Sequence, residues 1–241
     1  MTTLVFVHGF MGGSGQWDAQ VAAFAGSYNV ITPDLPGFGA NNHMAPLRSI
    51  RAYAEWVIKE LRKQDVQRYH LLGHSMGGMI VQEMARIDQD NIERLVLYGT
   101  GAVGVLPGRF ETIEQSKARA IADGAQATAR RIAATWFLDR EEALAFEACA
   151  TIAEKASPEA IQAGLDAMQG WRGDDFLQYI APETLVLWGD KDRTYQWQQT
   201  QQLWHTIPNT SLSVLPNCAH AVHLELPDIF NLLVTRFLSE K

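Results

Sequence analysis

The chain has 241 residues, of which 47% are hydrophobic and 20% are charged, and one hydrophobic core can absorb this length. Its 20 basic and 27 acidic residues give a formal net charge of −7, the wrong sign for a protein that binds phosphate backbones. We therefore expect no nucleic-acid partner.

No apolar run approaches the roughly 20 residues that a membrane-spanning helix needs, and the first residues have no basic region typical of a signal peptide. The two cysteines, Cys149 and Cys218, fit neither a disulfide framework nor a zinc site. We expect a cytoplasmic protein with no membrane partner, no metal and no cofactor, present as a monomer or a homodimer.

Six short apolar runs predict strands that are buried on both faces, because each is continuous rather than alternating. They lie at residues 4–7, 28–31, 69–72, 95–98, 185–188 and 212–215. A helix is predicted from Ile50 to Leu61, where apolar residues follow the helical period and Ser49 can cap the first turn. Another is expected to begin at Pro227. Alternating strands and helices predict an α/β protein with a mostly parallel, doubly wound sheet.

The 81 residues between Gly101 and Glu183 contain no convincing strand, although connections in such folds are typically about 2–6 residues long. Their pattern predicts four helices, at about 109–123, 125–137, 141–155 and 158–169. We expect residues 105–179 to form an inserted helical cap, and residues 1–104 and 180–241 to form the core domain.

The strongest chemical signal is Gly73-His-Ser75-Met-Gly77, which lies between a predicted strand and a predicted helix. Gly-x-Ser-x-Gly in this context is a nucleophile elbow, a tight turn that exposes the serine hydroxyl above the sheet. The glycines remove side chains that would collide in such a turn. We expect Ser75 to be the nucleophile.

A glycine-rich loop, His8-Gly-Phe10-Met11-Gly-Gly, follows the first strand. Its spacing does not fit the dinucleotide-binding motif, and no phosphate-loop lysine follows it. We expect the backbone N–H groups of Phe10 and Met76 to hold the oxyanion. His8 is interpreted as support for this loop, and Asp34, in the turn-rich loop after the second strand, as a residue that fixes that loop.

The expected base is His220, because it follows the last strand and lies at the carboxyl edge of the sheet, where catalytic groups gather. His223 is the weaker alternative and is expected to be a buried polar group. Two aspartates follow the preceding strand, and we favour Asp192 over Asp190 as the acid that orients the histidine. The order Ser75, Asp192, His220 is the one expected for a hydrolase triad on this type of sheet.

These motifs together resemble the α/β-hydrolase superfamily over nearly the whole chain. His8-Gly-Phe resembles its oxyanion loop, Asp34-Leu-Pro-Gly-Phe-Gly its second loop, and the segment from Gly189 to Asp192 its acid loop. The resemblance implies an α/β-hydrolase fold with about six core strands, since the N-terminal hairpin of many relatives is missing here. It also implies a capped enzyme that needs no cofactor.

The expected reaction is the cleavage of a small or medium ester, thioester or lactone through an acyl-enzyme on Ser75. The alternatives are a carbon–carbon bond hydrolase, a lyase or synthase of the menaquinone-pathway type with the same triad, and a ligand receptor without turnover. The expected partner is a small-molecule substrate, with a pocket wall drawn from Met11, His74, Trp136, Phe137, Phe146, Met168 and Trp171. Helix packing is the competing explanation for most of these side chains. Arg130, Arg131 and Arg172 could bind a substrate carboxylate, but no motif selects one of them.

Overall fold

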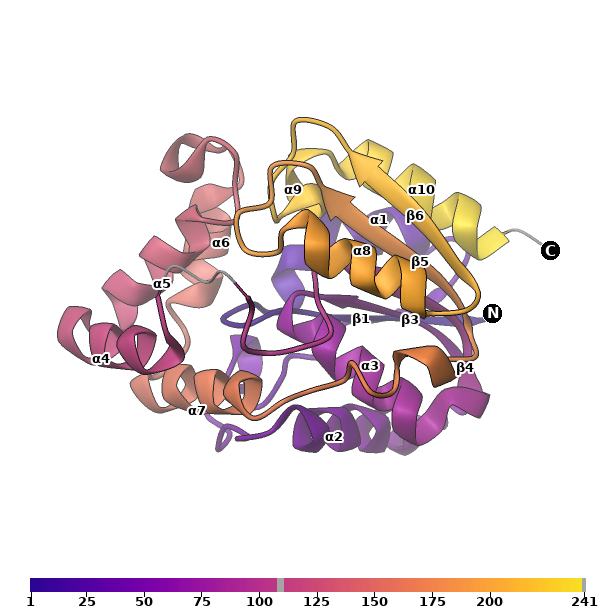
Figure 1. The fold of residues 1–241 in the computed structure, drawn as a ribbon, viewed down its shortest axis with the longest axis horizontal. Helices are drawn as coiled ribbons and strands as arrows, with labels where there is room; N and C mark the ends of the chain where they lie inside the picture. The colour runs from indigo at the N-terminus through magenta and orange to yellow at the C-terminus, as the bar shows by residue number, and fades with distance from the viewer. Residues whose placement is uncertain (108–110, 240–241) are drawn as a thin grey trace.

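A six-stranded, all-parallel sheet forms the centre of the computed structural model, which describes residues 1–107 and 111–239. The strand order is β2-β1-β3-β4-β5-β6 (Figure 1). The strands are β1 (Thr3–Val7), β2 (Asn29–Ile31), β3 (Tyr69–His74), β4 (Ile92–Tyr98), β5 (Glu183–Gly189) and β6 (Thr210–Leu215). All six predicted strands are confirmed.

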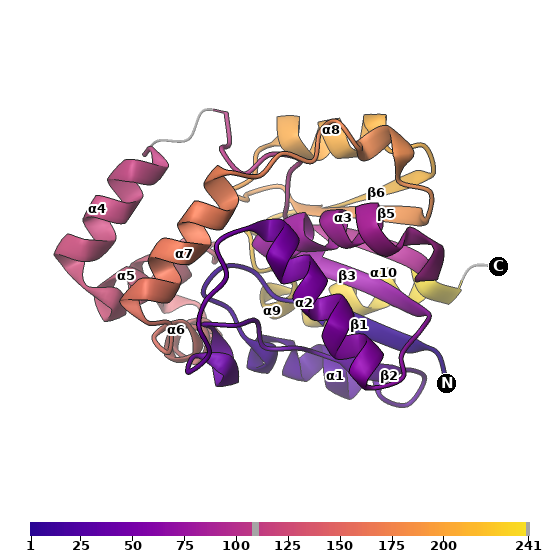
Figure 2. The same cartoon turned by 90° about the horizontal axis from the view of Figure 1, so that it is seen from below.

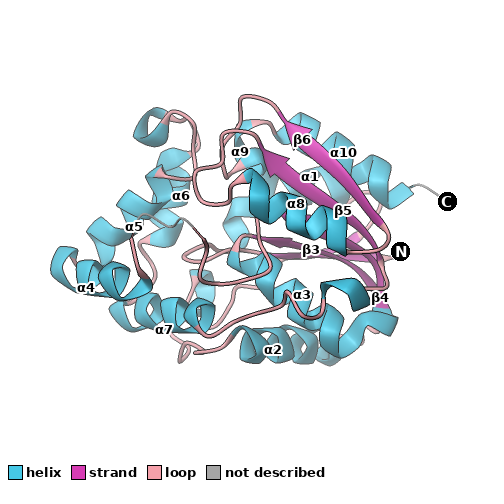
Figure 3. Cartoon of the chain, viewed as in Figure 1, coloured by secondary structure: helices cyan, strands magenta, loops and turns pink. Residues whose placement is uncertain are grey.

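Helices cover both faces of this sheet, as Figure 3 shows. Outside the long segment between β4 and β5, they are α1 (Asp18–Phe24), α2 (Ile50–Lys63), α3 (Met76–Asp88), α8 (Trp197–Thr206), α9 (Val222–Glu225) and α10 (Pro227–Ser239). Short 3-10 turns occur at Ser14–Trp17, Gly39–Asn41, Gln89–Asn91, Arg140–Glu142 and Leu177–Tyr179. The Ser49 hydroxyl accepts a hydrogen bond from the Ala52 N–H at 3.1 Å, which confirms the predicted cap of α2.

Successive side chains of the sheet enter two separate cores, because neighbouring residues of a strand point to opposite faces. In β1, Val5 and Val7 pack into the core beneath α2 and α3, whereas Leu4 and Phe6 pack into the core beneath α1 and α10. The edge strands β2 and β6 are partly exposed, in contrast to the burial expected from their sequences. An edge strand has a neighbour on one side only, and here the helices do not cover it fully.

Four helices lie between β4 and β5, beyond the carboxyl ends of the strands (Figures 1 and 2). They are α4 (Ile113–Asp123), α5 (Ala125–Ala134), α6 (Phe146–Ala153) and α7 (Pro158–Gln169). Their order agrees with the sequence, although α5 and α6 are shorter than predicted. The residues at which the first was expected to begin, 109 and 110, lie outside the described residues. The cap boundaries at residues 105 and 179 stay a prediction.

None of the helices in residues 1–107 and 111–239 has the length and apolar character that crossing a membrane requires.

Candidate active site

Ser75 lies in the tight turn that joins β3 to α3. Its backbone has φ 57° and ψ −121°, a conformation in the positive-φ region that side-chain-bearing residues rarely adopt. The Ser75 N–H donates to the carbonyl oxygen of Tyr98 at 3.0 Å, and the Thr100 hydroxyl donates to the carbonyl oxygen of Ser75 at 2.8 Å. These bonds from the β4 side hold the strained turn in place.

Gly77 allows this turn to pack against the end of β1. A Cβ atom on Gly77 would lie 2.2 Å from the carbonyl oxygen of Val7, closer than atoms approach in folded proteins. The sequence requirement for glycine at this position is therefore steric, because the first turn of α3 passes directly over the end of β1.

The loop after β1 crosses next to the serine. A Cβ atom on Gly9 would lie 2.9 Å from the Ser75 Cβ and 3.5 Å from its Oγ, so the backbone of this loop reaches the hydroxyl. Within the described part of the chain, the backbone N–H groups of Phe10 and Met76 have no hydrogen-bond acceptor in the protein. Met76 begins α3, so its N–H is one of the unpaired donors at a helix N-terminus.

His8 and Asp34 link the loop after β1 to the loop after β2. His8 is fully buried, and its Nε2 accepts the Leu35 N–H at 3.0 Å, so Nδ1 carries the proton that is donated to the carbonyl oxygen of Gly9 at 2.8 Å. Burial lowers the pKa of His8 and favours this neutral form. The Asp34 carboxylate accepts the N–H and the hydroxyl of Ser14, both at 2.8 Å. Both residues contact loops, as the sequence indicated.

His220 and Asp192 form a buried hydrogen-bonded pair. His220 Nδ1 donates to Asp192 Oδ2 at 2.8 Å, and the side chains are 1% and 0% exposed. The other carboxylate oxygen of Asp192 accepts the N–H groups of Thr194 and Tyr195, at 2.7 and 3.1 Å. Because the carboxylate can only accept, the proton of the neutral imidazole lies on Nδ1, and Nε2 carries the lone pair. Asp190 instead contacts Lys191 and the Cys218 N–H, on the other side of the loop.

A layer of aromatic side chains supports the backbone of His220 on the side away from the cavity. The Tyr98 hydroxyl donates to the His220 carbonyl oxygen at 2.8 Å, and His74 Nε2 donates to the same oxygen at 3.1 Å. The rings of His74 and Tyr98 stack at 4.4 Å. Burial holds the pKa of His74 well below its usual value, so this ring is neutral. His74 was expected in the pocket wall, but the pleat of β3 directs it away from the cavity.

His223, the weaker candidate for the base, is buried in this layer and does not line the cavity. Its Nδ1 lies 3.1 Å from the Tyr98 hydroxyl and its ring lies 4.4 Å from that of Trp17. Burial lowers its pKa to about 3. Its position confirms the expectation of a buried polar group.

Ser75 and His220 line one cavity of about 490 Å³ between the sheet and helices α4, α5 and α7. Phe10, Trp136 and Met168, which were also expected at the site, contribute to its wall. No hydrogen bond between the Ser75 hydroxyl and His220 is present in the described structure, so the two groups share the cavity without direct pairing.

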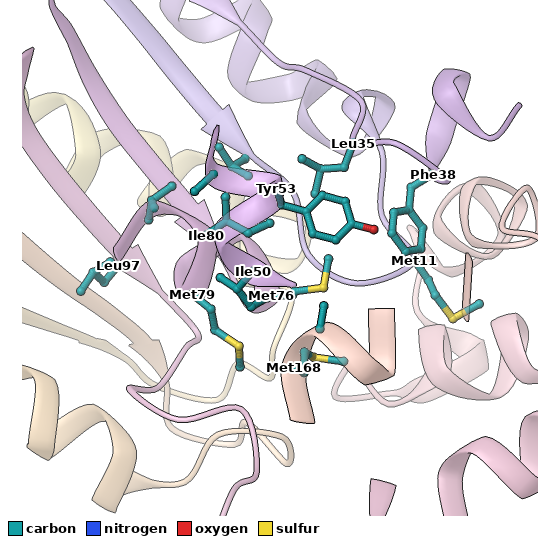
Figure 4. Packing of buried hydrophobic residues seen from close by; sticks show 14 of the residues in the cluster. Met11, Leu35, Phe38, Ile50, Tyr53, Met76, Met79, Ile80, Leu97 and Met168 are labelled. Carbon is teal, nitrogen blue, oxygen red and sulfur yellow. The ribbon is translucent and has the colours of Figure 1, made fainter. Parts of the chain in front are cut away.

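Four other side chains expected in the pocket wall lie outside it. Met11 is fully buried in the core near Phe38 (Figure 4). Phe137 is also fully buried, and Phe146 is 1% exposed under the guanidinium of Arg130. Trp171 is 7% exposed and donates from Nε1 to Glu83 on α3. In each case packing within or beneath the helices takes up the apolar side chain.

Most of the cavity wall contributed by α5 and by the loop after Asp192 was not predicted from the sequence. Thr128 and Ile132 line the cavity from α5 and Thr135 from the residue after it, while Tyr195 lines it from the loop, stacking on His220 at 5.7 Å. Of the three arginines considered, Arg131 lines the cavity. Arg130 bonds to Glu147 and Glu154, and Arg172 bonds to Asp174.

The described residues bring together no group of three or more His, Cys, Asp or Glu side chains with the geometry for a metal ion.

Comparisons with known proteins identify the family and the fold. A profile described as the alpha/beta hydrolase family matches residues 4–231. The RutD protein of Agrobacterium fabrum, which carries a carbamate hydrolase name, is 25% identical over 98% of this chain and 92% of its own. A hydrolase from Pseudomonas aeruginosa is similar over 99% of this chain and 91% of its own, with 25% identity and a TM-score of 0.88. An enol-lactonase from Burkholderia xenovorans has the same fold, with 23% identity, a TM-score of 0.88 and coverage of 100% and 93%.

Proposed function

Because the chain belongs to the alpha/beta hydrolase family, we propose that it is a serine hydrolase in which Ser75, His220 and Asp192 act as a triad. Its substrate is a small or medium carboxylic ester, thioester or lactone. The observation that carries this proposal is the buried 2.8 Å bond from His220 to Asp192, beside a cavity that Ser75 also lines.

In the first half of the reaction, His220 Nε2 takes the proton of the Ser75 hydroxyl while Oγ attacks the carbonyl carbon. The carbonyl oxygen becomes an oxyanion and accepts the free N–H groups of Phe10 and Met76. When the tetrahedral intermediate collapses, the bond to the leaving group breaks and the imidazolium gives its proton to that group. An acyl-serine results.

In the second half, water enters the place of the leaving group and gives a proton to His220 Nε2 as it attacks the acyl carbon. Collapse breaks the bond to Ser75, whose oxygen takes the proton back, and the carboxylic acid departs. Asp192 keeps the imidazole in the right tautomer and stabilises its cationic form in both halves. No step of this scheme calls for a metal or an organic cofactor.

The cavity limits the size of the substrate. A volume of about 490 Å³ lies within the range of small-molecule sites, and its wall is mostly apolar and includes Phe10, Leu165 and Met168. The carbamate hydrolase name of the RutD relative also describes cleavage at a carbonyl carbon.

A labelled fluorophosphonate tests the nucleophile directly, because it modifies only an activated serine. We expect labelling and hydrolysis of 4-nitrophenyl butyrate by the wild type and neither by Ser75→Ala. Failure of the folded wild type to react would overturn the proposal. Turnover that requires His220 but forms no acyl-enzyme would identify a lyase, and tight binding without turnover would identify a receptor.

Asp192→Asn and Asp190→Asn form a matched pair for the role of the acid. An asparagine at 192 can present its amide N–H₂ to the imidazole and favour the wrong tautomer, so we expect kcat to fall by about 10³–10⁴-fold. The Asp190 carboxylate contacts Lys191 and the backbone of Asn217 and Cys218, and its replacement is expected to change kcat by less than about threefold. Equal losses in the two variants would contradict the assignment of Asp192.

A further inference from the structure

The last residue of β4, Tyr98, is hydrogen-bonded to the backbone of both the proposed nucleophile and the proposed base. Its carbonyl oxygen accepts the Ser75 N–H at 3.0 Å, and its side-chain hydroxyl donates to the carbonyl oxygen of His220 at 2.8 Å. Ser75 and His220 lie far apart in the sequence and on different loops. Because a single residue binds both, the position of the imidazole relative to the serine depends on Tyr98.

The two residues that follow Tyr98 add contacts of the same kind. The Thr100 hydroxyl donates to the Ser75 carbonyl oxygen at 2.8 Å. Gly99 has φ 52°, and a Cβ atom there would lie 3.2 Å from His220 Nδ1, so the imidazole packs directly against this backbone. The segment 98–100 is therefore in contact with the serine turn and with the base at the same time.

Burial commits the Tyr98 hydroxyl to its partners in the protein. Tyr98 is fully buried, so water does not compete for its proton, and the carbonyl oxygen of His220 can only accept. The same hydroxyl accepts the His223 N–H at 3.2 Å. Burial also holds the pKa of Tyr98 well above its usual value, so the phenol remains a hydrogen-bond donor at neutral and moderately alkaline pH.

The Tyr98 ring is itself fixed by its neighbours. It stacks on His74 at 4.4 Å and packs against Phe230 of α10 at 5.1 Å. A ring packed in this way has little freedom to follow a movement of the loop that carries His220, so its hydroxyl acts as a fixed point. His74 Nε2 donates to the same carbonyl oxygen at 3.1 Å, so loss of the Tyr98 hydroxyl weakens this support without removing it.

We propose that Tyr98 and Thr100 are positioning residues that set the separation between the Ser75 hydroxyl and the His220 imidazole. This inference rests on the proposed function, because it gives both residues a role in the same reaction. Tyr98 acts through the backbone of His220 and Thr100 through the backbone of Ser75. The rate of proton transfer between two groups depends steeply on their approach, so a small displacement of either one slows the reaction.

The positioning role predicts an effect on kcat and not on KM. Among residues 1–107 and 111–239, the cavity wall includes neither Tyr98 nor Thr100, so neither is expected to contact the substrate. A change at either position should therefore alter the reacting geometry and leave the pocket as it is.

Tyr98→Phe and Tyr69→Phe form a matched pair, because each removes one phenol hydroxyl from a fully buried tyrosine of the sheet. The Tyr69 hydroxyl donates to Asp88 at 2.7 Å. For 4-nitrophenyl butyrate we expect kcat to fall about tenfold in Tyr98→Phe, with KM within about twofold of the wild type. Tyr69→Phe should lower the unfolding temperature and leave both kinetic constants unchanged.

Thr100→Val and Thr100→Ser test the other end of the segment and do not depend on the folding of Tyr98→Phe. Valine keeps the volume of threonine and loses the hydroxyl, whereas serine keeps the hydroxyl and loses a methyl group. We expect kcat and the rate of fluorophosphonate labelling to fall about fivefold in Thr100→Val and to stay near the wild type in Thr100→Ser. A residue that only fills space would give the opposite order.

A measurement without turnover separates the positioning role from the proposed chemistry. NMR gives the rate at which the Nδ1 proton of His220, in the 2.8 Å bond to Asp192, exchanges with water. Exchange of a buried proton requires local opening, so we expect it to be about tenfold faster in Tyr98→Phe and unchanged in Tyr69→Phe.

Equal exchange rates and equal kcat values in the two tyrosine variants overturn the proposal, as does a Thr100→Ser variant that is less active than Thr100→Val. Faster exchange in Tyr98→Phe, in a protein whose wild type cleaves no ester, supports the positioning role and refutes the hydrolase. Ester cleavage that Tyr98→Phe leaves unchanged has the reverse meaning.

Discussion

Arg193 Nη1 donates a hydrogen bond to the carbonyl oxygen of Phe137 at 2.7 Å, across 56 positions of the sequence. The partner carbonyl belongs to the turn after α5, and Arg193 directly follows Asp192. Ala221, which follows His220, donates its N–H to the carbonyl oxygen of Trp136 at 2.8 Å. The loops that carry Asp192 and His220 are thus both hydrogen-bonded to the same short segment, residues 136–138.

Glu225 adds a third tie to this segment. One carboxylate oxygen accepts the Leu138 N–H at 2.6 Å and the other accepts the Ala219 N–H at 2.7 Å. Because Trp136 lines the cavity, the position of that wall is coupled to the position of His220.

Arg193→Lys tests this coupling. A lysine has one ammonium group in place of the planar fork and cannot reach both carbonyl oxygens in the same geometry. We expect kcat/KM for a neutral ester to fall by about tenfold, with KM raised and the unfolding temperature lowered by a few degrees. Arg172→Lys is the control, since Arg172 is exposed and its guanidinium bonds to Asp174. If the two variants have the same kinetics, the tie has no influence on the site.

Gly77→Ala is expected to lower the free energy of unfolding by about 3 kcal/mol or more, because the added methyl group would lie 2.2 Å from a backbone oxygen that cannot move aside easily. Urea unfolding measures the change. Gly26→Ala provides the comparison: a Cβ there meets nothing within 4 Å and the residue is exposed, so we expect no loss of stability. A tolerated alanine at 77 would show that the elbow can move away from β1.

The stability of the fold should decrease as the pH falls from about 7 to about 5. Burial lowers the pKa values of His8, His74 and His223 in the folded protein below the unfolded value of 6.5. The unfolded chain therefore binds protons that the folded chain does not, so stability is complete above about pH 6.5 and is lost below it. With its pKa lowered to about 3, His223 contributes about 2 kcal/mol to this loss.

Urea midpoints at the two pH values measure the effect. His223→Phe keeps an aromatic ring beside Trp17 and should reduce the pH dependence, whereas His43→Gln, at an exposed position, should not. A pH dependence equal in wild type and His223→Phe would mean that His223 is protonated in the fold.

Sequence patterns predicted the sheet and the elbow because both depend on local signals. Residues 4–7 form a strand inside the sheet and are buried as their apolar run predicts, and the Gly-x-Ser-x-Gly spacing marks the elbow within five residues. The pairing of His220 with Asp192 was also accessible, since the carboxyl ends of parallel strands meet at one edge. The partial exposure of β6 could not be predicted from the sequence, because it depends on which neighbours the strand has in the sheet.

The cavity wall was less predictable. Helical periodicity identifies an apolar face, but it does not say whether that face meets another helix, as at Phe146, or the cavity, as at Met168. Thr128 was missed for the opposite reason, because a polar residue in a helix is expected to face solvent. The packing of α5 against α4 and α6 turns it inward.

The three ties to residues 136–138 also bear on engineering. Exchanging helices α4–α7 for those of another hydrolase replaces the backbone carbonyls and N–H group that Arg193, Ala221 and Glu225 bind. A transplanted insert that lacks a turn of the same shape at this point would leave the loop that carries His220 without these hydrogen bonds. Chimeras that alter specificity should therefore retain the native turn and splice on either side of it.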